Sequence, residues 1–211
     1  MPVAARLKLV TDETPTRGFG RVPPRKPRNE DRRPREHLTE TEVAAIAKAA
    51  GNRGRHGHRD RTMIMLCFRH GLRVNELVNL KWEAANLDEA LLTVRRDKKG
   101  RNCDHPIPGD ELRELRRLKR EQPSGSRWVF MTERGGPMTD RAFRLILSTA
   151  AEAIAFPFPV HPHMLRHAVG YKLIVDRQPI REVQRYLGHR RIESTEVYTD
   201  AAPGQFTEFF R

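Results

Sequence analysis

The sequence has few of the features that mark secreted or membrane proteins. Only two cysteines, Cys67 and Cys103, occur in 211 residues, too few for a disulfide framework. No apolar run approaches the roughly 20 residues that cross a bilayer, and the first ten residues lack the apolar centre of a secretory signal. We therefore expect a reducing, cytoplasmic location and no membrane partner.

Acidic charge is scarce relative to basic charge. The chain has 27 Asp and Glu against 40 Lys and Arg, a formal net charge of +13. A chain this basic usually binds a polyanion, and nucleic acid is the commonest one. The rival, binding to a membrane surface, would need a basic amphipathic helix or a lipidation signal, and the sequence shows neither. Nucleic acid is thus the predicted partner.

Residues 1–37 differ in composition from the rest. They hold six of the 15 prolines and ten Lys and Arg against five Asp and Glu. Large apolar residues are sparse and aperiodic, so the segment cannot bury enough apolar surface to offset chain entropy. We predict a disordered basic tail, which serves either as a solubilising segment or as an arm that contacts DNA phosphates. A folded domain is predicted over 38–211.

The pattern of residues 38–211 predicts a mainly α fold with one small antiparallel sheet (α+β). Thr39 and Glu42 form a capping box, Leu38 and Val43 fit a hydrophobic staple, and Gly51 ends this first helix. Further helices are expected near 63–70, 73–80, 110–121, 139–154, 161–176, 179–187 and 192–199. Strands at 91–94 and 102–107 would form a hairpin with a basic tip, and 128–130 a short strand.

Two motifs in the C-terminal third carry candidate chemistry. On the helix near 161–176, His163, Arg166 and Gly170 share one face, separate from the apolar stripe. Gly170 there would permit close approach of another backbone. A metal site built from the histidines at 161, 163 and 167 would lack an acidic or cysteine ligand, so no metal is expected.

The second motif lies around the end of the helix at 179–187. Gly188 is predicted to cap this helix, with His189 just beyond it. Tyr198 follows nine residues later and is one of only three tyrosines. Taken alone, such a tyrosine is usually a half-buried packing residue.

Taken together, these motifs resemble the tyrosine recombinase (phage integrase) family over about residues 38–210. The family carries an arginine, a lysine, a His-x-x-Arg box, a histidine and a tyrosine, in that order. The matching residues are Arg73, Lys98, His163, Arg166, His189 and Tyr198. Lys99 competes with Lys98, and the runs HPHMLRH and YLGHR look most like the fimbrial phase-variation invertases. The resemblance implies the family's catalytic-domain fold, with no cofactor and no metal.

The resemblance implies a covalent route to DNA strand exchange. Tyr198 would attack a phosphodiester and leave a 3′-phosphotyrosine and a free 5′-hydroxyl. Arg73 and Arg166 suit the non-bridging oxygens, because each presents a charged planar fork of donors. His189 would donate a further hydrogen bond to the phosphate.

Proton transfer is assigned on the same resemblance. Lys98, on the hairpin turn, would protonate the leaving 5′-oxygen, and His163 would manage the tyrosine proton. Glu76, three residues after Arg73, is interpreted as a structural partner that holds an arginine or the helix.

The resemblance also implies the assembly. Double-stranded DNA is the expected partner, with four protomers on two DNA sites, in a nucleoid-associated setting. A monomer in solution and an accessory DNA-bending protein are left open. Most members carry a further helical domain ahead of the catalytic one, whereas only residues 1–37 precede it here. That difference leaves open a substituting tail, a weaker grip on DNA or a helper protein.

Three points stay open from the sequence. Inversion, integration and excision are not distinguished, and the apolar edge of Phe206, Phe209 and Phe210 could dock on a neighbouring protomer or on its own domain. A type IB topoisomerase-like relaxing enzyme shares the chemistry. A DNA-binding regulator that no longer cuts is the rival from another class, although such a protein would not need Tyr198.

Overall fold

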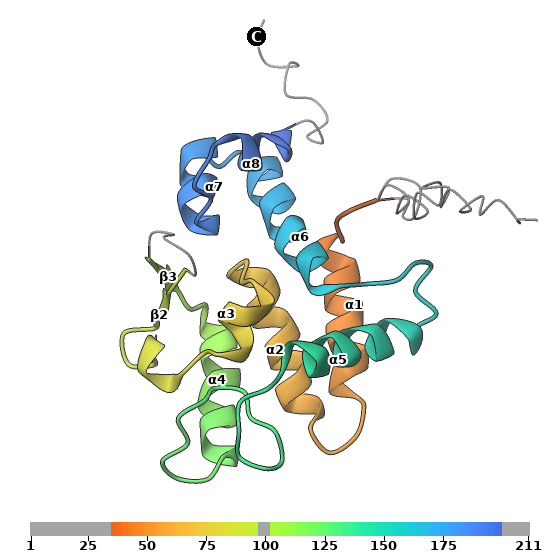
Figure 1. Ribbon diagram of the computed structural model, residues 1–211, viewed down its shortest axis with the longest axis vertical. Coiled ribbons are helices and arrows are strands. Elements are labelled where there is room, and N and C mark those ends of the chain that lie inside the picture. The colour runs from red at the N-terminus through yellow and green to blue at the C-terminus, as the bar shows by residue number, and fades with distance from the viewer. Residues whose placement is uncertain (1–34, 97–101, 200–211) are drawn as a thin grey trace, which may run out of the picture. The chain divides into compact units, whose positions relative to one another are not determined.

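The computed structural model describes residues 35–96 and 102–199, which lie in one compact unit. Its helices (Figure 1) are α1 (Glu40–Gly51), α2 (Gly57–Arg69), α3 (Val74–Val78), α4 (Gly109–Glu121), α5 (Asp140–Glu152), α6 (Pro162–Val175), α7 (Ile180–Leu187) and α8 (Glu193–Glu196), with a 3-10 turn at Trp82–Ala84. The predicted mainly α fold with a small sheet is confirmed. The predicted tail up to residue 34 and the stub near 205–210 lie outside the described residues.

Helix α1 begins where its capping residues predict. The Glu42 backbone N–H donates to Thr39 Oγ1 at 3.3 Å, and the Thr39 N–H donates to a Glu42 carboxylate oxygen at 2.8 Å. This reciprocal pair satisfies two backbone donors that the first helical turn leaves free. Arg35 also pairs with Glu42, and His37 packs on the Tyr171 ring at 3.9 Å. Residues 35–37 thus contact the helical unit, while the proposed boundary between tail and domain stays a prediction.

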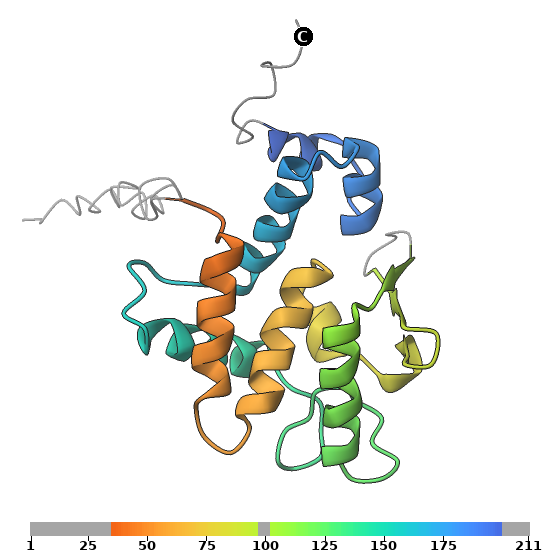
Figure 2. The ribbon, with the colours of Figure 1, turned by 180° about the vertical axis from the view of Figure 1, so that it is seen from behind.

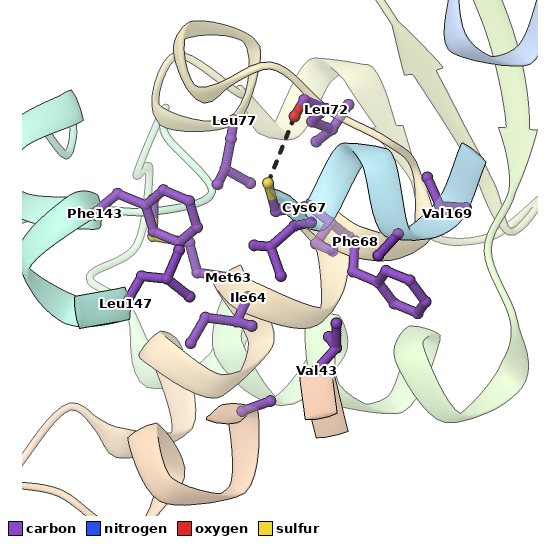
Figure 3. Close-up of a cluster of buried hydrophobic side chains, with 14 of the residues drawn as sticks. Val43, Met63, Ile64, Cys67, Phe68, Leu72, Leu77, Phe143, Leu147 and Val169 are labelled. Atoms are coloured by element: carbon purple, nitrogen blue, oxygen red, sulfur yellow. Dashed lines mark hydrogen bonds between the residues drawn. The ribbon is translucent and has the colours of Figure 1, made fainter. Parts of the chain in front are cut away.

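The hydrophobic core is built around α2. Met63, Ile64, Cys67 and Phe68 are buried on this helix. Figure 3 shows them among apolar side chains of α1, α5 and α6, including Phe143, and Figure 2 shows α1 and α2 running side by side. Each such side chain stabilises the fold by about 1.5–3 kcal/mol when fully buried. Within the described ranges, no helix combines the length and apolarity needed to span a bilayer.

Helix α2 begins at Gly57, six residues before the predicted start. The early turn is held by tertiary contacts: His58 lies between two carboxylates of α4, at 2.6 Å from Glu114 and 2.9 Å from Glu121. Gly57 also backs onto the Gly51 carbonyl, where a Cβ would clash. A local pattern rich in His, Arg and Gly could not reveal these partners.

The sheet has three antiparallel strands in the order β1 (Ala85–Asn86), β2 (Leu91–Val94) and β3 (Cys103–Pro106). The predicted hairpin is confirmed, with Leu92 opposite His105 and Val94 opposite Cys103. The two-residue β1 was not predicted. The predicted strand at 128–130 is wrong: the structure has only an isolated bridge between Lys81 and Trp128 there.

A buried polar network ties this hairpin to three helices. His105 of β3 is fully buried and stacks on the Tyr186 ring of α7 at 3.8 Å. Its Nδ1 lies 3.2 Å from Nδ1 of His70, whose Nε2 lies 2.9 Å from the Glu111 carboxylate of α4. The hairpin is therefore fixed against α2, α4 and α7 by polar contacts that few other groups could replace.

This network predicts a loss of stability in acid. Burial and the neighbouring His70 and Arg96 charges lower the pKa of His105 to about 3, so the folded chain stays unprotonated there. Below pH 6.5 this imidazole is protonated in the unfolded chain but not in the folded chain. The free energy of unfolding therefore falls as the pH falls. We expect His105 alone to contribute a loss of up to about 1.4 kcal/mol per pH unit between pH 6 and 4, within the slope that urea unfolding measures for the whole chain. His105→Phe keeps the stacking and should reduce that slope; an unchanged slope would contradict the assignment.

Candidate active site

The buried guanidinium of Arg166 forms the centre of the site. Arg166 lies on α6 with 1% of its surface exposed, and its fork donates to the Gly71 and Leu187 carbonyls, the latter at 2.5 Å. Burial and the nearby Arg96 and Arg73 charges lower its pKa to about 10, so it stays charged at neutral pH. These contacts fix the side chain between α6, the start of α3 and the end of α7.

Arg73 lies beside this centre, at the start of α3. Its Nη1 donates to Glu76 at 2.8 Å, and its backbone N–H donates to the other Glu76 oxygen at 2.9 Å. The expected role of Glu76 as a structural partner is confirmed by these contacts. The Arg73 side chain remains 39% exposed, so it can meet a ligand from solvent.

A third arginine, Arg96, joins the site and was missed by the sequence reasoning. It follows β2, its side chain is fully buried, and its Nη1 donates to Glu76 at 2.6 Å. Arg73 and Arg96 thus both donate to the Glu76 carboxylate, and the charge of Arg166 lies near enough to interact with it. The three guanidinium charges exceed that single negative charge by two. Such a surplus favours a bound anion.

His189 lies directly beyond α7, as predicted. Gly188 caps the helix in the left-handed conformation, at φ 65°, which glycine adopts without strain. Nδ1 of His189 lies 2.9 Å from the Thr195 hydroxyl. Burial and the Arg166 and Arg73 charges lower the pKa of His189 to about 3, so the imidazole is neutral at pH 7. In the tautomer whose Nδ1 accepts from the Thr195 hydroxyl, Nε2 carries the proton and can donate.

Tyr198 packs into the same site with only 2% of its surface exposed. Its ring lies 6.2 Å from the His189 ring and 5.6 Å from the His167 ring, between centroids. A Cβ on Gly170 would come within 2.5 Å of the Tyr198 ring. Gly170 therefore makes room for an aromatic ring, and not for another backbone as the sequence suggested.

The two histidines of α6 contact each other. The exposed His163 and the half-buried His167 have ring centroids 4.4 Å apart. Of the two, His167 makes the ring contact with Tyr198. Burial and the His163 charge lower the pKa of His167 to about 4, so this ring is also neutral at pH 7.

The structure therefore gathers five of the six predicted residues around one place, from α3, α6 and the segment that follows α7. Figure 1 shows α7 and α8 beside the end of α6 that leads into them. Lys98 and its competitor Lys99 lie outside the described residues. The described neighbours of that turn are Arg96 and Asn102, joined by a 3.3 Å hydrogen bond from the Arg96 N–H.

Comparison with known families decides the relationship. Residues 36–205 match the phage integrase family, a span that includes all six predicted residues. The chain belongs to the phage integrase family.

Relatives within this family are similar over most of the chain. The type 1 fimbriae regulatory proteins FimB and FimE of Escherichia coli K12 are 34% and 35% identical, over 83% and 82% of this chain and 90% and 89% of their own length. Tyrosine recombinase XerD of Ralstonia nicotianae is 35% identical over 94% of this chain and 64% of its own. This phage integrase family member is a tyrosine-type site-specific DNA recombinase, as its motifs predicted.

Solved structures share the fold of this phage integrase family member. XerA recombinase superposes with a TM-score of 0.68 at 23% identity, over 77% of this chain and 59% of its own. The catalytic domain of bacteriophage HP1 integrase gives 0.60 at 20% identity, over 81% and 90%. The predicted integrase catalytic-domain fold is confirmed.

A substitution at Gly170 tests directly whether the observed position of the Tyr198 ring is the reactive one. In Gly170→Ala the new methyl group would push the Tyr198 ring away by about 1 Å, and a displacement of that size can cost ~10² in rate. We expect DNA cleavage at least tenfold slower, measured as covalent adduct, with a preserved melting transition. Ala168→Gly, a change of equal size on the same helix, is the control. Undiminished cleavage in Gly170→Ala would show that the observed position of the Tyr198 ring is not the reactive one.

Proposed function

We propose that this recombinase cleaves one strand of duplex DNA through Tyr198. The phenolic oxygen attacks a backbone phosphorus, the bond to the 5′-oxygen breaks, and a 3′-phosphotyrosine forms. The observation that carries the proposal is the packing of the Tyr198 ring beside His189 and close to the charge of Arg166. Burial raises the pKa of Tyr198, and the Arg166 charge opposes that rise.

The phosphate is proposed to bind among the guanidinium groups. Negative charge on the non-bridging oxygens grows in the transition state, and preorganised donors stabilise it most. Arg73 and Arg166 supply planar forks, and neutral His189 supplies one N–H. The DNA phosphate is proposed to approach the site from the side of Arg73, because the Arg73 side chain reaches solvent.

Two proton transfers complete the step. We assign the proton for the leaving 5′-oxygen to Lys98, or to its neighbour Lys99, on the hairpin turn. The phenolic proton leaves by way of the α6 histidines: His167 contacts both Tyr198 and His163, and His163 opens to solvent. Both rings are available as bases when neutral.

The phosphotyrosine bond preserves the energy of the cleaved diester. A 5′-hydroxyl from another strand can attack it and restore a continuous backbone, which distinguishes exchange from hydrolysis. Exchange between two duplexes requires at least two sites held together. The proposed assembly is four protomers on two DNA sites, formed from monomers in solution, with an accessory DNA-bending protein where the grip is weak. Of the solved neighbours, XerH recombinase was captured bound to its difH substrate.

A nicked-duplex library tests the proposal whatever the sequence of the target site. Duplexes of randomised sequence carry a nick just 3′ of the interrogated phosphate, so that the short 5′-hydroxyl strand dissociates after cleavage. DNA that stays attached to protein in SDS is then sequenced to give the target site. We expect a covalent product with one consensus sequence.

Two further outcomes would select the rivals. DNA binding without any covalent product would favour a regulator that does not cut. A covalent product accompanied by relaxation of plasmids lacking the consensus, without exchange between two consensus sites, would favour a relaxing enzyme. Exchange between two sites supports recombination.

Binding to DNA should weaken steeply with salt. The chain's net charge of +13 predicts several phosphate contacts, each giving a slope of about −0.9 in a plot of log K against log salt. Fluorescence anisotropy with a labelled duplex measures the slope between 50 and 200 mM salt. Over this range of salt concentration, several phosphate contacts change the affinity strongly. A flat response would contradict electrostatic binding.

A further inference from the structure

Arg96 is a buried cation of the site, and it lies just beyond the strand β2. None of its side-chain surface is exposed. Nη1 donates to Glu76 at 2.6 Å and to the Gly71 carbonyl at 3.4 Å, and Nη2 donates to the Tyr186 carbonyl at 2.6 Å. One guanidinium therefore connects the end of β2 with α3 and α7.

Each of these contacts leads to a different phosphate-binding group. Glu76 holds Arg73 through its other carboxylate oxygen, at 2.8 Å. The Gly71 carbonyl that Arg96 reaches also accepts from Arg166. The third contact fixes the last turn of α7, directly ahead of His189.

The packing of Arg96 is as constrained as its hydrogen bonds. A Cβ on Gly188 would come within 2.7–2.9 Å of Nε, Cγ and Cδ of Arg96. The glycine that caps α7 thus leaves room for this arginine as well as for the turn. The Nε–H of Arg96 is buried and has no hydrogen-bond partner among the described residues.

Burial of this charge has a cost that the fold tolerates. Burial lowers the pKa of Arg96, and the Glu76 charge only partly opposes it. Replacing a buried ion pair by apolar side chains is often neutral or stabilising, so stability alone is a weak reason for the group. Its three acceptors instead share one property. Glu76 and the Gly71 carbonyl also accept from Arg73 and Arg166, and the Tyr186 carbonyl lies in the last helical turn before His189.

We infer that Arg96 is a positioning residue that aligns Arg73, Arg166 and His189 on the scissile phosphate. This inference rests on the proposed function. Arg96 does not touch the phosphate itself, because it is fully buried behind Glu76 and Gly188. Its loss should misplace the donors, slow cleavage and leave DNA binding in place.

The test compares two substrates that differ in phosphate charge. The first has an ordinary phosphodiester at the cleavage position, and the second has a methylphosphonate there, in which a neutral methyl group replaces one charged oxygen. Aligned guanidinium groups accelerate the first more than the second. We expect Arg96→Gln to slow release of the 5′-hydroxyl strand by ~10² on the phosphodiester, the loss typical of one preorganised donor. On the methylphosphonate the loss should be under about tenfold, because little charge remains to stabilise.

Arg95→Gln is the matched control. Arg95 precedes Arg96 in the chain, carries the same charge and is 66% exposed, with one 3.4 Å contact to Glu83. It should cleave both substrates at the wild-type rate. Arg96→Lys keeps a charge opposite Glu76 but lacks the fork, and it should show the same substrate dependence. It takes the place of Arg96→Gln in the test if Arg96→Gln does not fold.

The outcomes separate this inference from the proposed function. A wild-type protein that forms no covalent product would refute the proposed function. A wild-type protein that cleaves, with equal losses in Arg96→Gln on both substrates, would refute only the role of Arg96. Cleavage by Arg96→Gln that is restored by a 5′-thiol leaving group, and not by the methylphosphonate, would also refute the role of Arg96. Arg96 would then act on the leaving oxygen. An Arg96→Lys protein without a melting transition would assign Arg96 to stability and overturn the inference.

Discussion

Replacing Tyr198 by phenylalanine is expected to abolish the covalent protein–DNA product while DNA binding stays at the wild-type level. The variant loses one hydroxyl group and keeps the ring that packs on Gly170, so the fold should be retained. Without the phenolic oxygen no phosphotyrosine can form. Gel analysis in SDS after incubation with the trapping duplex measures the product, and anisotropy measures binding.

Tyr171 provides the matched control for this substitution. Its ring lies 5.1 Å from that of Tyr198, and its hydroxyl donates to the Val197 carbonyl at 3.4 Å. Tyr171→Phe should still form the covalent product. Product that persists in Tyr198→Phe and disappears in Tyr171→Phe would transfer the role of nucleophile to Tyr171.

The second large effect is expected at Arg166. Substitution by alanine would leave the buried Leu187 carbonyl without its side-chain donor, at about 1–3 kcal/mol, and would remove one of the two side-chain donors of the Gly71 carbonyl. It would therefore mix folding with catalysis. Arg166→Lys keeps the charge and loses the fork. We expect cleavage slower by ~10²–10³, as for other preorganised donors, in rapid-quench measurements of adduct formation.

A surface arginine is the control for that experiment. Arg144 of α5 is 53% exposed and pairs with Asp140 one turn earlier. Arg144→Lys should cleave at the wild-type rate and melt at the wild-type temperature. Wild-type cleavage by Arg166→Lys would show that a point charge suffices there and would refute the bidentate role.

Local features of the sequence predicted much of the fold. The Thr39–Glu42 capping box and the glycine after α7 are short-range signals, and both elements begin or end where they indicate. The order and gaps of the motif residues predicted the family, while the roles of the individual site residues stay a prediction. Five of the six residues could be placed because their motifs lie on well-formed helices or directly beside them.

Features that depend on distant partners were not predicted. Arg96 looks like any charged residue near a basic turn, and its burial depends on Glu76 and Tyr186, which lie 20 and 90 residues away in sequence. Gly170 was placed on the correct face, but its neighbour proved to be a ring from a later segment. The Trp128 strand failed because a short apolar run can make a single bridge as easily as a strand.

The most direct test of the account is the position of the covalent bond in the trapped complex. After digestion of the complex by protease and nuclease, mass spectrometry identifies the peptide that carries a nucleotide. The account predicts a single modified peptide, with the nucleotide joined through a phosphodiester to the oxygen of Tyr198. A nucleotide attached to any other side chain would contradict it.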